Sequence, residues 1–226
     1  MSRFKAIDLR GVKTYSAAER PSKVSTDEVA LPPRAGMTMR EFLLGLPHIL
    51  KADDLKAVAR AVVQAKKLGK PVLVMLGGHV IKTGCAPILA GLADAGFFTH
   101  FAYNGSAAIH DTELARFGHT SEDVAAQLAD GSFGMASDTA ALVNEAAKVA
   151  RERGDGFGET VGRLLVEEQA PHLDRALLAH CHTLGLPYTL HVAIGTDIVH
   201  QHPGADGEAI GEASFLDFRI FTATVA

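Results

Sequence analysis

Three apolar segments, each followed by a short polar loop that contains glycine, constrain the fold of this sequence most. They span residues 70–76, 97–103 and 186–194, and the loops are Gly77-Gly78-His79, Asn104-Gly105-Ser106 and Gly195-Thr196-Asp197. The continuous apolar run of the first segment is typical of a strand in a parallel sheet that is covered on both faces. Strands that alternate with helices favour parallel β-α-β units with right-handed crossovers. The sequence therefore predicts an α/β fold with a parallel sheet.

Apolar spacing, capping residues and terminating glycines predict helices around these strands. The expected ranges are 37–50, 52–68, 80–95, 107–117, a helix that opens at residues 120–121, 136–153, 159–169 and 171–184. Residues 1–36 show no sustained period and are predicted to form an N-terminal arm. Residues 37–226 are predicted to form a single α/β domain. Gly156, Gly158 and Gly162 deviate from dinucleotide-binding spacing and follow a charged helix, so we assign them to a turn between two helices.

Composition excludes several classes of protein. The 22 Lys and Arg against 26 Asp and Glu give a net charge of −4, so no basic excess exists to neutralise a nucleic acid. No apolar run reaches the roughly 18–20 residues that a membrane helix needs, and the N-terminus lacks the apolar stretch of a signal peptide. Only two cysteines, Cys85 and Cys181, are present. We therefore expect a protein of the reducing cytoplasm, without a membrane or nucleic-acid partner.

The glycine-containing loops after the strands are candidate ligand sites. In an open parallel sheet, ligands bind at the carboxyl ends of the strands, where glycine lets the backbone approach a phosphate and helix N-termini offer free N–H groups. The alternative is that these turns contain Gly and Asn for conformational reasons alone. Three such loops in succession favour the ligand site. The Lys82-Thr83 pair does not make a P-loop, because Ile81 stands where the motif requires glycine.

The densest cluster of ionisable side chains follows the third strand. Within residues 191–212 it contains His191, Asp197, His200, His202, Asp206, Glu208 and Glu212. Imidazoles and carboxylates at this spacing suit a metal ion, or a polycation held by carboxylates with histidines that move protons. A polar loop whose acids face water is the alternative. At the start of the helix after residue 106, His110, Asp111 and Glu113 suit either the helix dipole or a ligand in the crevice.

Three segments together resemble deoxyhypusine synthase. They are Val74 to Gly84, Asn104 to Leu114, and the Gly195-Thr196-Asp197 loop with its acidic continuation to Glu212. Their order and spacing match over roughly residues 70–221, about two thirds of the chain. The resemblance implies a Rossmann-like open parallel sheet with helices on both faces, an NAD cofactor and a homotetramer. It also implies transfer of an aminobutyl group from spermidine, a polyamine, either to a lysine of a translation initiation factor precursor or to an amine acceptor such as putrescine.

The residue patterns and the resemblance together give expected roles for individual residues, none of them a metal ligand, although His79, His110, His200 and His202 are more histidines than the family leads us to expect at these loops. The residues expected to bind NAD are Gly77, Gly78, His79, Lys82, Asn104, Gly105, Ser106, Ala107, Asp111 and Asp197. The residues expected at the catalytic centre are Asp197, His200 and His202. The residues expected to bind the substrate are His110, Asp206, Glu208 and Glu212.

The resemblance leaves one catalytic role unassigned. The lysine that carries the aminobutyl group lies in a glycine-rich segment of the family beyond the point where this sequence stops, and no lysine follows Lys148. The α/β domain is therefore expected to be incomplete at its C-terminus. Two further hypotheses stay open. One is a metal-dependent hydrolase of an amine or amide that uses the His and Asp cluster of residues 197–206. The other is a shortened, non-catalytic paralogue.

Overall fold

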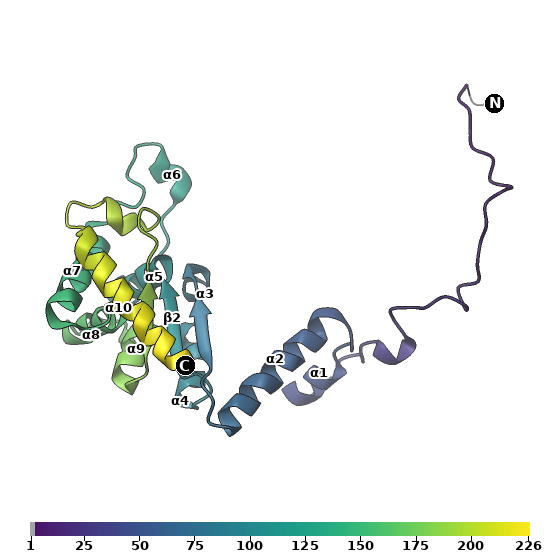
Figure 1. Cartoon of the computed structure of the whole chain (residues 1–226), viewed down its shortest axis with the longest axis horizontal. Helices are drawn as coiled ribbons and strands as arrows, with labels where there is room; N and C mark the ends of the chain where they lie inside the picture. Colours follow the sequence, from purple (N-terminus) through teal and green to yellow (C-terminus); the bar gives the residue numbers. More distant parts are fainter. Residues whose placement is uncertain (1–2) are drawn as a thin grey trace. The chain divides into compact units, whose positions relative to one another are not determined.

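The computed structural model describes residues 3–226 and divides the chain into two units, with the boundary after Ala61 (Figure 1). The first unit contains the 3-10 helix η1 (Thr26–Glu28), α1 (Met39–Gly45) and the first part of α2 (Leu50–Lys67). Capping boxes at Ser25 and Thr38 begin η1 and α1. Residue 36, where the sequence placed the start of the α/β domain, lies inside this first unit.

The second unit contains the predicted parallel sheet. Its strands are β1 (Leu73–Leu76), β2 (His100–Asn104) and β3 (Tyr188–His191), in the order β1-β2-β3. Leu73 pairs with His100 and Phe101 pairs with Tyr188, and both strand pairs are parallel. The prediction of an α/β fold with an open parallel sheet is confirmed. The strands begin later than the apolar segments do.

Helices connect the strands as the spacing predicted, with differences at their ends. The elements between β1 and β3 are α3 (Gly78–Lys82), α4 (Ala86–Asp94), α5 (Gly105–Phe117), α6 (Val124–Leu128), α7 (Ser137–Arg153), α8 (Phe157–Glu167), η2 (Leu173–Arg175) and α9 (Leu177–Leu184). The single helix expected over 80–95 is two helices, because Gly84 adopts a φ of +87° between them. Gly158 and Gly162, expected in a turn, lie inside α8.

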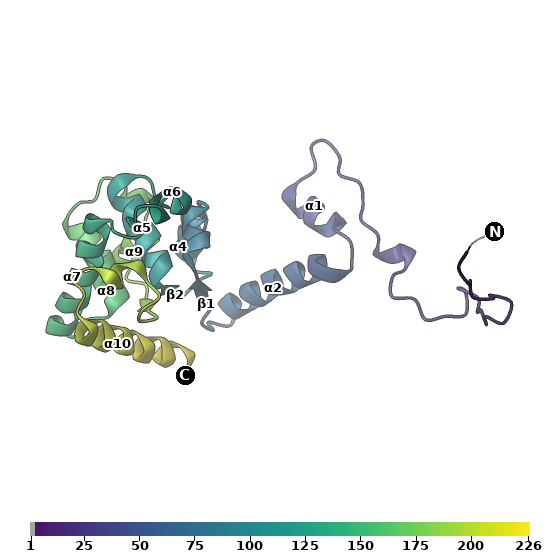
Figure 2. The same ribbon diagram turned by 90° about the horizontal axis from the view of Figure 1, so that it is seen from above.

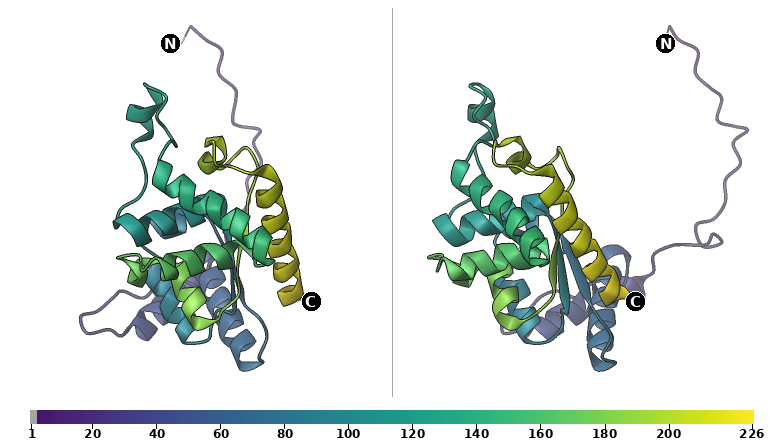
Figure 3. Two further views of the ribbon diagram at one scale, coloured as in Figure 1. Left: turned by 90° about the vertical axis from the view of Figure 1, so that its left-hand side faces the viewer. Right: turned by 60° about the vertical axis from the view of Figure 1, so that its left-hand side comes forward.

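The two faces of the sheet are covered by different parts of the chain. Both crossovers step in the same direction across the sheet, so right-handed connections place their helices on one face. There α5 packs on β2, and α8 packs on β3. Of the described elements, α10 (Gly207–Val225) covers the opposite face, where it packs on β3 and part of β2 (Figures 2 and 3).

Helix α10 was not predicted from the sequence. Residues up to Glu212 were expected to continue an acidic loop, but Asp206 caps the helix by accepting hydrogen bonds from the backbone N–H groups of Glu208 and Ala209. The apolar residues that follow belong to this helix. Within the described residues, no helix combines the length and the apolar character that crossing a membrane requires.

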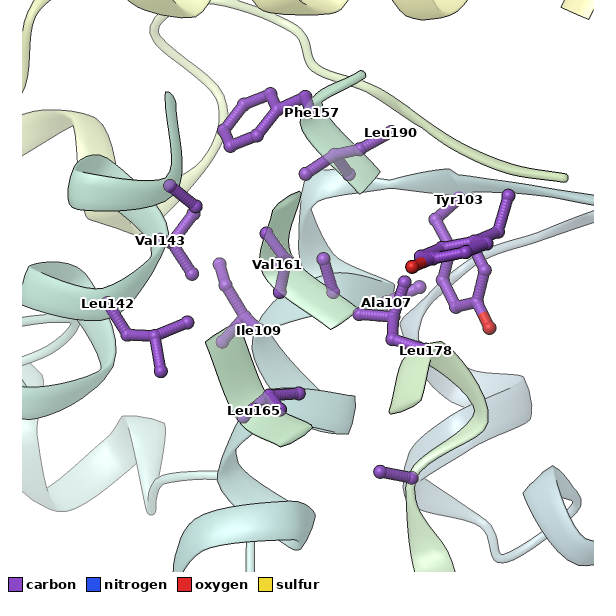
Figure 4. Close-up of a cluster of buried hydrophobic side chains, with 14 of the residues drawn as sticks. Tyr103, Ala107, Ile109, Leu142, Val143, Phe157, Val161, Leu165, Leu178 and Leu190 are labelled. Carbon is purple, nitrogen blue, oxygen red and sulfur yellow. The ribbon is translucent and has the colours of Figure 1, made fainter. Parts of the chain in front are cut away.

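The core lies between the sheet and the crossover helices. Ile109 of α5, Val161 and Leu165 of α8, and Leu190 of β3 are buried side chains of this cluster (Figure 4). Burying such side chains contributes roughly 1.5–3 kcal/mol each, which fixes the strand ends relative to the helices that begin there.

Candidate functional site

A groove opens beside the carboxyl ends of β1 and β2, on the side of the sheet that carries α10. Its volume is about 470 Å³, which suits a small-molecule ligand. The residues that matter for its chemistry are Met75, Ala102, Asn104, His191, Phe218 and Phe221. Met75 is 75% exposed, so α10 leaves the β1 side of this face uncovered. The groove is apolar and aromatic, with polar groups at its end.

Two helices begin at the rim of this groove. Gly77 precedes α3, and Asn104 caps α5 by accepting a hydrogen bond of 2.9 Å from the N–H of Ala107. A Cβ atom on Gly77 would lie 3.5 Å from the Asn104 amide nitrogen, so the two loops are neighbours. The sequence therefore placed these two strand ends together correctly. The N–H group of Ala107, expected to face a phosphate, is used by the cap.

Gly78 and Gly105, the first residues of α3 and α5, each leave room for a side chain from another part of this protein. A Cβ atom on Gly78 would collide with Ser106 and His110 of α5. A Cβ atom on Gly105 would collide with the carboxylate of Asp197. The space beside these glycines, where the sequence predicted a phosphate, is thus filled by side chains of the protein itself.

Asp197 reaches the N-terminus of α5 from the loop after β3. Its Oδ2 atom is buried and has no hydrogen-bond partner among the described residues. Burial raises the pKa of Asp197, and the nearby His200 opposes this shift. A negative charge at this place gains from the helix dipole. Asp197 therefore lies at the strand ends, as predicted, in the position of an anion.

His110 belongs to a buried polar cluster next to this site. Its Nδ1 lies 2.6 Å from the Thr120 hydroxyl, which donates to Glu113, and Glu113 also accepts a bond of 3.1 Å from Thr139. Burial lowers the pKa of His110, and Glu113 opposes this shift. His110 is thus held among protein groups through Nδ1, and its expected role in binding the substrate stays a prediction.

The other two basic residues of the first loop lie on α3. His79 is exposed and Lys82 is half-buried. Both are close enough to His110 to lower its pKa electrostatically. They lie near the candidate site, but neither lines the groove.

Asp111 has a structural role, which corrects its assignment to the cofactor or polyamine. Its side chain is fully buried and accepts hydrogen bonds from the N–H groups of Leu177 (3.0 Å) and Leu178 (2.6 Å). These are the first residues of α9, so Asp111 caps that helix from a distant part of the chain. A carboxylate without exposed surface cannot contact a ligand.

The acidic residues expected to bind a polyamine surround an arginine instead. Arg151 of α7 lies 2.9 Å from a carboxylate oxygen of Glu208, 3.2 Å from one of Glu212 and 4.0 Å from one of Asp206. Asp206 also caps α10. These carboxylates are therefore already paired with a cation of the chain, which explains why they gather there.

The histidines after β3 are also engaged. His200 Nδ1 accepts a bond of 3.3 Å from the N–H of Gly195, and His202 Nε2 lies 2.8 Å from the carbonyl oxygen of Gly134. Across residues 3–226, no three His, Cys, Asp or Glu side chains are arranged to hold a metal ion. The structure thus offers no assembled ligand set for the metal-dependent hydrolase.

Several residues of the groove escaped sequence reasoning. Phe218 and Phe221 come from the unpredicted α10, and Met75 and Ala102 looked like ordinary strand residues. His191 stood in the histidine-rich segment but received no role. Strand alternation is the signal that could have found it, because His191 shares a sheet face with Thr189.

A second buried carboxyl resembles that of Asp111. Asp217 of α10 is fully buried and accepts backbone hydrogen bonds from α8 and β3. Burial raises the pKa of Asp111 and that of Asp217 to about 7, and the backbone N–H groups oppose these shifts. Both carboxyls therefore bind a proton more readily in the folded protein than in the unfolded chain.

This proton binding predicts a pH-dependent stability. Between about pH 4 and pH 7 the folded state holds protons on Asp111 and Asp217 that the unfolded state has lost. The free energy of unfolding should therefore decrease as pH rises, by up to about 1.4 kcal/mol per pH unit for each group. Burial lowers the pKa of His100, His110 and His191, so these histidines act in the opposite direction below about pH 6.5.

Urea unfolding of the wild type and of Asp111→Asn, from pH 4.5 to pH 8, separates the two effects. The histidines contribute equally to both proteins, so the stability advantage of the wild type should shrink as pH rises. An advantage that stays constant or grows with pH would show that Asp111 remains ionised in the fold.

Comparisons of this chain with known proteins do not identify a family to which it belongs. No protein-family model and no curated protein matches this sequence. Among solved structures, the apo structure of ArgZ, an arginine dihydrolase from the ornithine-ammonia cycle in cyanobacteria, is 19% identical with a TM-score of 0.47. The match covers 78% of this chain and 22% of that one.

A second solved structure is similar to the same extent. It is a conserved LOR/SDH protein from Methanococcus maripaludis S2, 19% identical with a TM-score of 0.45, covering 89% of this chain and 53% of that one. The chain thus spans about a fifth and about half of the length of these two proteins. At these TM-scores neither similarity supports a function, and the resemblance to deoxyhypusine synthase stays a prediction.

Proposed function

We propose that the α/β unit binds NAD at the carboxyl ends of β1 and β2. The observation that carries the proposal is the groove of about 470 Å³, which joins an apolar, aromatic wall to the starts of α3 and α5. Phe218, Phe221 and Met75 would hold a flat ring, and the backbone at Gly77 and Asn104 would face the diphosphate. NAD would supply the acceptor for a hydride.

The fit is good for the ring and incomplete for the diphosphate. The groove offers an apolar and aromatic surface, which suits the faces of a flat ring. At α5, however, the carboxylate of Asp197 covers Gly105. A phosphate can approach that glycine only when Asp197 turns away. We therefore place the diphosphate beside Gly77 and Asn104.

The expected reaction is NAD-dependent aminobutyl transfer from spermidine, on the strength of the sequence resemblance. The carboxylates of Asp206, Glu208 and Glu212 lie around Arg151, so a polyamine would have to displace that pairing. The acceptor protein and the homotetramer are expectations of the same resemblance. NAD binding is the part of this function that the groove supports best.

Asn104→Asp tests the cofactor site. Aspartate caps a helix as well as asparagine does, so α5 should keep its stability. It also places a negative charge beside the expected diphosphate, which should weaken NAD binding about tenfold or more. Isothermal titration with NAD measures the dissociation constant, and thermal unfolding checks the fold.

Gln64→Glu is the matched control, because it makes the same amide-to-acid change on an exposed part of α2. It should leave NAD affinity unchanged. A wild-type protein that does not bind NAD would overturn the proposed function. Equal weakening by both variants would place the cofactor elsewhere. Addition of spermidine to the protein with NAD, followed by NADH absorbance, tests the transfer; absence of NADH argues against spermidine as substrate.

A further inference from the structure

A chain of hydrogen bonds runs along the face of the sheet that α10 covers, next to the groove. Thr224 Oγ1 of α10 lies 2.8 Å from His100 Nδ1, and His100 Nε2 lies 3.0 Å from Thr189 Oγ1. Thr189 Oγ1 in turn lies 2.8 Å from His191 Nε2. His191 lines the groove, so the chain connects a buried polar pair to a ligand-sized space.

The position of each proton in this chain follows from its first member. The Thr224 hydroxyl donates to the carbonyl oxygen of Ile220, so Thr224 accepts from His100 Nδ1–H. A neutral His100 then has no proton on Nε2, which must accept from the Thr189 hydroxyl. Thr189 has its proton committed and accepts from His191 Nε2–H. Neutral His191 is thereby left with an unprotonated Nδ1.

The surroundings favour the neutral form of both rings. Burial lowers the pKa of His100 to about 4, with a further contribution from His191, and burial also lowers the pKa of His191. Both rings meet Phe221 edge-on, with centroids 5.6 Å and 5.4 Å from it. Among the described residues, His191 Nδ1 has no hydrogen-bond partner. It is a free acceptor on a residue that lines the groove.

We infer that the groove takes a flat ring bearing an N–H donor, that His191 Nδ1 accepts this hydrogen bond, and that His100 and Thr189 are positioning residues that hold the His191 tautomer. An acceptor in an aromatic groove orients the ring, because an apolar site penalises a ligand that leaves a polar group unpaired. The identification of the ring as nicotinamide, with its carboxamide N–H as donor, rests on the proposed function.

Long-range proton–nitrogen NMR of the histidine rings tests the tautomers without any ligand. We expect His100 to carry its proton on Nδ1 and His191 to carry its proton on Nε2 at pH 8, where both rings are neutral. In Thr189→Val, which removes the hydroxyl between the rings, His191 should populate both tautomers. An Nδ1–H tautomer of His191 in the wild type, or a mixture there, would overturn the inference.

Two dinucleotides test the donor. Acetylpyridine adenine dinucleotide replaces the carboxamide of NAD by a methyl ketone, which has no N–H. The wild type should bind NAD about tenfold more tightly than this analogue, and His191→Phe should remove the preference. His180→Phe on α9, outside the groove, should retain it.

The outcomes distinguish the two proposals. If the wild type binds neither dinucleotide, the proposed function fails and the NMR result alone decides the proton arrangement. If the wild type binds both equally, NAD binding stands and the role of His191 is wrong.

Discussion

Asp217→Ala is expected to lower the free energy of unfolding of the α/β unit by about 3–6 kcal/mol. Asp217 accepts hydrogen bonds from the backbone N–H groups of Phe157 (3.0 Å), Gly158 (2.8 Å) and Leu190 (2.6 Å). Two of these groups begin α8 and the third belongs to β3. Alanine would leave all three buried donors without a partner, and each such donor costs about 1–3 kcal/mol.

Urea unfolding at neutral pH measures this loss, and Asp206→Ala is the matched control. Asp206 is also a carboxyl that binds backbone N–H groups, but it caps α10 at the surface, where water replaces it. Its removal should cost only about 1 kcal/mol. Asp217→Asn keeps one carbonyl oxygen and should fall between the two. Similar losses for Asp206→Ala and Asp217→Ala would show that Asp217 does not hold α10, α8 and β3 together.

The same residue explains why α10 was missed in the sequence. Its buried positions include Ala209, Ile210, Ala213 and Asp217, which have helical spacing. The last of them is a carboxylate where an apolar residue is expected. A buried acid can be explained only when its hydrogen-bond partners are known, and the partners of Asp217 lie 27 to 60 residues away in the sequence. The strands were found because continuous apolar runs and following glycines are local signals.

The candidate site was predictable to the same limited extent. The meeting of Gly77 with Asn104, and the arrival of Asp197 at α5, follow from parallel topology, because carboxyl ends of neighbouring strands share one edge. The partners of Asp111 on α9 and of Glu208 on α7 lie far away in the sequence, so residue spacing could not indicate these contacts. Residue type and spacing therefore predicted the position of the site better than the role of each residue in it.

Gly158 and Gly162 show a different limit, because a local spacing was mistaken for a turn. Both lie in α8, four residues apart and on one face. A Cβ atom on Gly162 would lie 2.6 Å from the Leu178 carbonyl oxygen and 2.8 Å from the Tyr188 ring. One on Gly158 would lie 2.7 Å from the Tyr188 carbonyl oxygen. These glycines let α8 pack directly on β3 and α9.

The double variant Gly158→Ala with Gly162→Ala is therefore expected to lower the free energy of unfolding by about 2–6 kcal/mol, since each added methyl overpacks a rigid contact. The sign of the change in the free energy of unfolding is informative, because replacing glycine by alanine at an open helix position stabilises a protein by up to about 1 kcal/mol. Gly211→Ala supplies that comparison: it lies within α10, and its Cβ would meet no atom within 4 Å.

We expect thermal and urea unfolding of the wild type, the α8 double variant and Gly211→Ala to show stability changes of opposite sign for the two variants. Gly211→Ala should raise stability by about 0.5–1 kcal/mol, and the α8 variant should lower it. If both changes stabilise, α8 does not lie against β3 as closely as the backbone distances require. A loss in the α8 variant should also disturb the Asp217 bonds, because the N–H of Gly158 is one of its donors. The combined variant with Asp217→Ala should then lose less than the sum of the separate losses, since neighbouring sites couple.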